Sequence, residues 1–142
     1  MKRKTFNVKI NAPREKVWDV LWNDKTYSQW TQPFSQGSYA KTDWKEGSEI
    51  FFMAPDDNGM YGIIEEKKKP KRMVFKHLGE IQKGQNVKKD WDNVMEIYEL
   101  NEENGTTNLK VSIDLDTEYE DFFDKIFPKA LENLKNLSET EK

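Results

Sequence analysis

The residue type best suited to acid–base chemistry occurs once in this chain, as His77. His77 alternates with Met73 and Phe75, and these two apolar residues indicate that this face of a predicted strand points inward. An imidazole titrates near neutrality without help, so an inward His77 could serve as a polar contact or a general base in an interior cavity. The alternative is a hydrogen-bonded histidine of the core or of the strand end. The sequence pairs no serine, cysteine or carboxylate with it, so it does not support a catalytic triad.

The composition excludes several other kinds of chemistry. There are no cysteines and only 1 histidine among 142 residues, which removes disulfides, thiolate metal sites, thiol nucleophiles and any metal site built on two imidazoles. We therefore expect no metal site, no cofactor and no catalytic residue, and we lean against an enzyme.

Charge and hydropathy limit the partners and the location. The chain has 23 Lys+Arg against 26 Asp+Glu, a net charge of -3, which argues against a nucleic-acid-binding protein. No apolar run of about 20 residues is present, so we expect no membrane span. The basic start of the chain is not followed by the apolar segment of a signal peptide, and the prediction is a cytoplasmic protein.

Aromatic residues are abundant for so polar a chain, at 13%. This abundance argues against disorder and predicts an aromatic core under a charged surface. Six of these residues are expected to converge between a sheet and a helix, namely Trp30, Phe52, Phe75, Phe122, Phe123 and Phe127.

The elements that would position these residues follow from periodicity and turn signals. We expect a strand at 4–10, two short helices at 13–22 and 24–30, and a meander of strands at 38–44, 48–54, 60–68, 71–79, 92–100 and 106–115. Residues 79–90 contain several glycine and amide residues and little apolar content, which predicts a long and mobile loop. The chain is expected to close with an amphipathic helix from Tyr119 to Leu137, which Pro128 should bend or divide at about Phe127.

Motifs along the chain resemble a known family. The run Ile10-Asn11-Ala12-Pro13-Arg14-Glu15-Lys16-Val17-Trp18 resembles the opening of the SRPBCC (START/Bet v-like) superfamily. Further matches are Trp30, the Asp43…Glu46-Gly47 turn, Asp57-Asn58-Gly59 with Gly62, Ile64, Glu66 and Pro70, then Arg72-Met73-Val74-Phe75 and Gly105-Thr106-Thr107. Together they resemble the subfamily of activator of heat-shock protein 90 ATPase homologues, from about Phe6 to Leu134. His77 is a departure, because the family often has tryptophan there.

The resemblance implies an α+β helix-grip fold. In that fold a curved antiparallel sheet, here of about seven strands, wraps around a long C-terminal helix, and two short helices follow the first strand. We expect residues 1–142 to form a single domain of this kind. The motifs are turn, cap and core positions, so they indicate the fold better than the function.

The helix-grip fold commonly encloses a cavity between sheet and helix, and an empty cavity costs about 24 cal/mol per Å³, so either side chains or a ligand fill it. The first hypothesis is a binding protein for a small hydrophobic or aromatic ligand, with His77 and Tyr61 orienting its polar atoms and the 80–91 loop near the mouth. The expected ligand-binding residues are Trp30, Phe52, Tyr61, Ile64, Phe75, His77, Phe122, Phe123 and Phe127.

Two other functions stay open. The resemblance implies a co-chaperone-like module that binds a chaperone and stimulates the heat-shock protein 90 ATPase. It also allows a cavity enzyme, such as a cyclase, dehydratase or hydrolase. The oligomeric state does not follow from the sequence.

Overall fold

A computed structural model of the chain describes residues 1–140. It contains strand β1 (Lys2–Ile10), helices α1 (Arg14–Leu21) and α2 (Asp24–Trp30), strands β2 (Tyr39–Lys41), β3 (Glu49–Met53), β4 (Gly59–Lys68), β5 (Arg72–Gln82), β6 (Gln85–Lys88), β7 (Val94–Glu103) and β8 (Thr106–Leu115), the 3-10 turn η1 (Thr117–Tyr119) and helix α3 (Glu120–Thr140).

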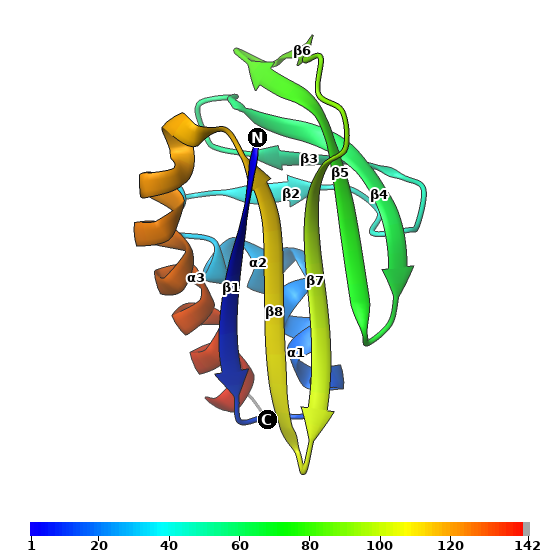
Figure 1. Cartoon of the computed structure of the whole chain (residues 1–142), viewed down its shortest axis with the longest axis vertical. Coiled ribbons are helices and arrows are strands. Elements are labelled where there is room, and N and C mark those ends of the chain that lie inside the picture. The colour runs from blue at the N-terminus through cyan, green and yellow to red at the C-terminus, as the bar shows by residue number, and fades with distance from the viewer. Residues whose placement is uncertain (141–142) are drawn as a thin grey trace.

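The strands form one antiparallel sheet in the order β1-β8-β7-β5-β4-β3-β2, as Figure 1 shows. Two register shifts interrupt the pairing of β4 with β5, one at Tyr61/Gly62, where β5 has the extra residue, and one at Ile64/Glu66, where β4 has it. Such bulges increase the local twist and bend the strand, which helps the sheet curve. Gly62 is required at the first shift, because a Cβ there would lie 2.1 Å from the carbonyl oxygen of Lys76.

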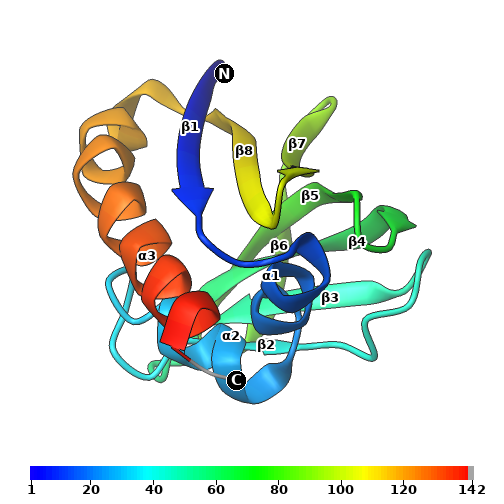
Figure 2. The ribbon, with the colours of Figure 1, turned by 90° about the horizontal axis from the view of Figure 1, so that it is seen from below.

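The three helices lie on the concave side of this sheet (Figure 2). Helix α1 follows Pro13 and buries Val17, Trp18, Val20 and Leu21. Helix α2 begins after Asn23, whose side-chain oxygen accepts a hydrogen bond from the Lys25 amide at 3.0 Å. This bond satisfies one of the free amides at the start of the helix.

Helix α3 is a single helix with Pro128 inside it, so of the two expected effects of this proline, a bend or a division at about Phe127, the division does not occur. Proline removes one backbone hydrogen bond and costs roughly 3 kcal/mol in a helix interior. The buried face of α3, which includes Phe127, Ala130, Leu131 and Leu134, provides packing on both sides of the proline. We attribute the continuity of the helix to this packing.

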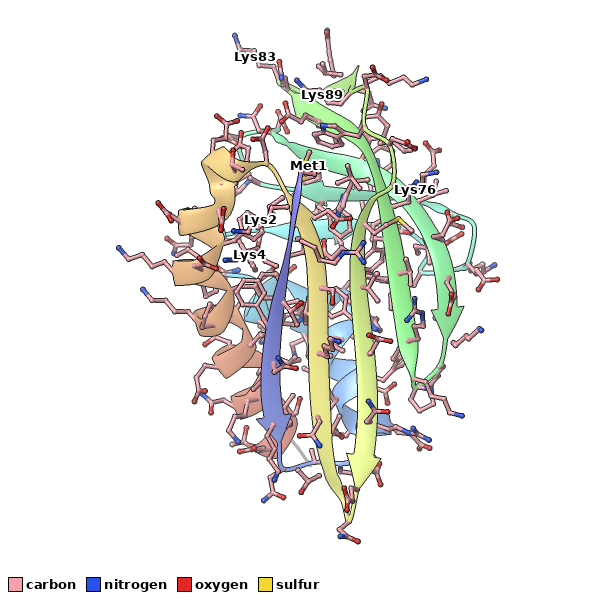
Figure 3. All side chains as sticks on the ribbon, viewed as in Figure 1. Met1, Lys2, Lys4, Lys76, Lys83 and Lys89 are labelled. Atoms are coloured by element: carbon pink, nitrogen blue, oxygen red, sulfur yellow. The ribbon has the colours of Figure 1, made fainter. Side chains whose placement is uncertain are left out.

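Ion pairs tie the start of α3 to the first strand. Lys4 on β1 lies 3.2 Å from Glu120 and 3.1 Å from Asp124, and Lys2 lies 3.0 Å from Glu120. Figure 3 shows both lysines on β1 extending toward the first turns of α3. The N-terminal strand therefore holds the helix at the side of the sheet.

The long loop expected at residues 79–90 is also wrong. Strand β5 continues to Gln82, and β6 returns antiparallel to it with Gln82 opposite Gln85. The two residues between them, Lys83 and Gly84, both have positive φ, which is the geometry of a tight hairpin turn. The β5–β6 hairpin projects beyond the rest of the sheet (Figure 1).

The architecture confirms the expected helix-grip fold, with two short helices after the first strand and a long C-terminal helix. Strand β6, which pairs with β5, is additional to the roughly seven strands that were expected. Within residues 1–140, no helix has the length and apolar character needed to cross a membrane.

Candidate functional site

A cavity of about 240 Å³ lies between the concave face of the sheet and helices α2 and α3. Its wall takes residues from α2 and the segment after it, from β2, β3, β4, β5, β7 and β8, and from α3. The aromatic rings on this wall are those of Tyr27, Trp30, Phe34, Tyr39, Phe52, Tyr98, Phe123 and Phe127.

Five of the nine residues expected in the site line this cavity. They are Trp30, Phe52, His77, Phe123 and Phe127. Trp30 is fixed because its indole Nε1 donates a hydrogen bond to the carbonyl of Leu21 at 3.2 Å. Phe127 is fixed by stacking on Phe6, with ring centroids 4.8 Å apart.

The other four residues lie elsewhere. Phe75 packs among Trp22, Phe52 and Tyr98 with ring centroids 5.2 to 6.1 Å apart, and is part of the solid core rather than the wall. Ile64 is likewise fully buried in that core.

Tyr61 and Phe122 point away from the cavity. Tyr61 is paired with Phe51 across β3 and β4, and their rings stack 6.4 Å apart. Because Phe52 faces the cavity, its neighbour Phe51 and the paired Tyr61 lie on the opposite face of the sheet. Phe122 is 45% exposed on α3.

A buried carboxylate completes the polar side of the cavity. Glu96 on β7 lines the cavity with its side chain 13% exposed, and its Oε1 lies 3.0 Å from Nε2 of His77. The hydroxyl of Tyr98 donates to the other oxygen, Oε2. His77 is 3% exposed, and its second nitrogen, Nδ1, has no hydrogen-bond partner within the described residues.

The charge of this carboxylate affects two phenols. Burial, together with the negative charge of Glu96, raises the pKa of Tyr98 well above its ordinary value. The same two causes raise the pKa of Tyr27, which is also on the cavity wall. Both tyrosines are therefore neutral donors or acceptors at physiological pH.

Two buried hydroxyls form a second polar group on the wall. Thr31 Oγ1 donates to the carbonyl of Tyr27 at 2.6 Å and lies 2.7 Å from Oγ of Ser38. Both residues line the cavity. No periodic pattern marks them in the sequence, because they lie just after α2 and in the segment that follows.

The sequence could have indicated Glu96 and Tyr98. They alternate with Val94 and Leu100, which are buried, so a glutamate stands in an inward-facing series on β7. The pairing of His77 with Val94 and of Phe75 with Glu96 depends on the strand register, which places this glutamate beside the histidine.

The arrangement can bind a small apolar molecule and orient it through a few polar groups, which is the usual composition of a ligand site. Among residues 1–140, no group of three or more His, Asp or Glu side chains is placed to hold a metal ion. The His77–Glu96 pair is of the kind that orients an imidazole, although no nucleophile lies in hydrogen-bond contact with it in the described structure.

A family model described as "Activator of Hsp90 ATPase homolog 1-like protein" matches residues 11–139. A comparison with curated proteins gives no match.

Solved structures of similar fold come from several bacteria. The Aha1 dimer of Colwellia psychrerythraea is 18% identical with a TM-score of 0.77, over 100% of this chain and 99% of that one. DynU16, a putative protein in the dynemicin biosynthetic locus, is 13% identical with a TM-score of 0.75, over 100% of this chain and 49% of that one. Protein CV1439 of Chromobacterium violaceum is 14% identical with a TM-score of 0.71, over 96% and 97% of the two chains. At these identities the likeness is one of fold.

Proposed function

The chain belongs to the family of activator of Hsp90 ATPase homolog 1-like proteins, in the SRPBCC superfamily, and on this premise we propose that it binds a small hydrophobic or aromatic ligand between sheet and C-terminal helix. The observation that carries the proposal is the cavity of about 240 Å³, with an aromatic wall and one buried polar network. We place this activity in the cytoplasm, as expected from the sequence.

The size of the cavity limits the ligand. Sites for drug-sized molecules have volumes of roughly 300–1,000 Å³. A cavity of about 240 Å³ suits a molecule of one or two rings. The aromatic wall favours a flat apolar ligand, because rings stack or meet edge to face with gains of about 0.5–1.5 kcal/mol per pair.

The proposal is tested on two neighbouring residues of α3. Phe123 lines the cavity and Phe122 does not, so Phe123→Ala and Phe122→Ala make the same chemical change inside and outside the site. Native mass spectra of freshly purified wild type should show a bound small molecule, which organic extraction then identifies. Removal of the Phe123 ring should weaken retention of this molecule about tenfold.

The control variant is Phe122→Ala, whose ring lies outside the cavity. Phe122→Ala should retain the bound species as the wild type does. A clean apoprotein mass in the wild type, together with no binding of the neutral probe 2-naphthol, would remove the proposal.

A second candidate is a protein-interaction module for a chaperone, supported by the description of the matching family. Its test is the ATPase rate of a heat-shock protein 90 with and without this chain. Stimulation that survives in Phe123→Ala would favour this candidate, since a surface interaction does not need the cavity wall.

A further inference from the structure

We propose that the cavity recognises an aromatic ligand that carries an N–H or O–H donor and no negative charge, and that this donor binds Glu96. The inference rests on the proposed binding function and names the chemical class of the ligand. It follows from three observations on the cavity wall: the buried hydroxyls of Tyr98, Thr31 and Ser38 already donate to the protein, Glu96 keeps unused acceptor positions, and the wall has carboxylates but no lysine or arginine.

The buried hydroxyls of Tyr98, Thr31 and Ser38 are committed to the protein. Tyr98 donates its hydroxyl proton to Glu96, and Thr31 donates to the carbonyl of Tyr27 at 2.6 Å. Since the Thr31 proton is used, the 2.7 Å contact between Thr31 and Ser38 must use the proton of Ser38. The hydroxyls of Tyr27, Ser35 and Tyr39 also line the cavity and can donate as well as accept, so they select less strongly between ligands. The side-chain amide of Asn58 adds N–H donors to the wall.

Acceptor capacity, in contrast, remains free. A carboxylate accepts about four hydrogen bonds, and each oxygen of Glu96 has one side-chain partner, His77 or Tyr98. Because a carboxylate only accepts, the proton between Glu96 and His77 belongs to Nε2 of the histidine. In the neutral ring this leaves Nδ1 as an acceptor that is buried and has no hydrogen-bond partner within the described residues, so the acceptor that a ligand can reach is Glu96.

The charges on the wall disfavour an anion. The lining residues, all within the described part of the chain, include the carboxylates Glu96 and Asp114 and no lysine or arginine. Asp114 is already bound by the Arg3 guanidinium at 2.9 and 3.0 Å and by the Met95 amide at 3.0 Å. Within the described residues Glu96 has no lysine or arginine partner, and its side-chain contacts are with His77 and Tyr98. A ligand carboxylate would meet a buried negative charge with nothing to neutralise it, whereas an ammonium group would gain the carboxylate and the faces of the rings.

The experiment measures the affinities of four naphthalene probes by calorimetry at pH 7. They are 2-naphthol, a neutral donor; 2-methoxynaphthalene, which has no donor; naphthalen-2-ylmethylamine, a cation; and 2-naphthoate, an anion. In the wild type, 2-naphthol and the amine should each bind about tenfold more tightly than 2-methoxynaphthalene, and 2-naphthoate should bind least.

The variant Glu96→Gln keeps the shape of the side chain and removes its charge. We expect the preference for 2-naphthol over 2-methoxynaphthalene to fall to about threefold, and the handicap of 2-naphthoate to shrink. Glu103→Gln is the matched control, because it makes the same change at an exposed position on the same strand, and it should leave all four affinities unchanged.

The outcomes separate the inference from the function on which it rests. Binding of 2-naphthoate as tight as that of 2-naphthol overturns the inference and leaves the binding function intact. If Glu96→Gln folds and still prefers 2-naphthol over 2-methoxynaphthalene as strongly as the wild type does, the inference is also overturned and the binding function stays intact. Failure of all four probes to bind the wild type overturns both. If Glu96→Gln does not fold, the wild-type affinities alone test the inference, which requires 2-naphthol and the amine to bind more tightly than 2-methoxynaphthalene and 2-naphthoate.

Discussion

The ring of Phe127 should contribute far more to stability than that of Phe122, although both belong to the same helix. Phe127 is 1% exposed and stacks on Phe6, and its ring meets Phe34 at 5.2 Å with an angle of 82°. Loss of a buried phenylalanine side chain costs about 3–5 kcal/mol. Because Phe127 borders an existing cavity, its removal enlarges that space, and we expect a loss of about 3 kcal/mol for Phe127→Ala.

Phe122→Ala is the matched control. Its ring is 45% exposed, so the expected loss is below about 1.5 kcal/mol. Urea unfolding followed by tryptophan fluorescence measures both values, and thermal unfolding should show a fall of about 10 °C for Phe127→Ala. Equal losses for the two variants would refute the packing described here for α3.

Three further predictions concern the polar network, the first strand and the bulge. Tyr98→Phe should lose about 1.5–3 kcal/mol at pH 7, the value of a hydrogen bond to a charged group, whereas Tyr39→Phe, at an exposed position, should lose little. The pKa of Tyr98 is raised by burial and by Glu96, so wild-type stability should fall as pH rises above the ordinary tyrosine value of about 10, and less steeply in Tyr98→Phe, in urea titrations from pH 8 to 11. Burial disfavours the charged form of Asp114, but the hydrogen bonds from Arg3 and the Met95 amide outweigh this effect and lower its pKa. The ionised carboxylate therefore stabilises the fold above about pH 4, and this stabilisation is lost as the pH falls through the pKa of Asp114 in the folded state. Arg3→Ala should therefore cost up to about 1 kcal/mol at pH 7, a difference that disappears in acid-unfolding curves below pH 4. Gly62→Ala should cost at least about 3 kcal/mol or prevent folding, as judged by circular dichroism, whereas Gly47→Ala, with nothing within 4 Å of the added atom, should cost about 1 kcal/mol through its positive φ alone.

The sequence predicted those parts of the fold in which periodicity and packing agree. The alternation of Leu109, Val111, Ile113 and Leu115 predicted β8, and these residues are all buried. Prediction failed where tertiary packing outweighed the preference of a single residue. Pro128 indicated a bend or a division of the helix, and the packing of α3 prevents the division. Gly79 indicated a loop, although it lies within β5.

Gly79 has a specific packing role that no sequence pattern shows. A Cβ at this position would lie 2.7 Å from Cε1 of Tyr61. The glycine therefore makes room for the tyrosine ring on the outer face of the sheet. A residue that suggests flexibility in the sequence is in this case a contact position in a strand.

The candidate site was predictable only in part, for a geometric reason. Periodicity assigns a face to a residue, and it did so for His77. It does not say which inward residues border a cavity and which, like Phe75 and Ile64, lie in the solid core. The partner of His77 depended on the register of β5 with β7, which a single sequence does not specify.

The pairing of β1 with β8 has a consequence for how the chain is synthesised. Arg3 and Asp114, which bind each other across these strands, are 111 residues apart in the sequence, so β1 is synthesised well before β8 and must wait for it to have a partner. An unpaired strand edge with alternating apolar residues is prone to aggregate. In β1 the apolar Phe6, Val8 and Ile10 are accompanied by Lys2, Arg3, Lys4 and Lys9, and like charges of this kind keep nascent strands apart. The lysines that later hold α3 to the sheet thus also protect the strand during the interval before the sheet closes.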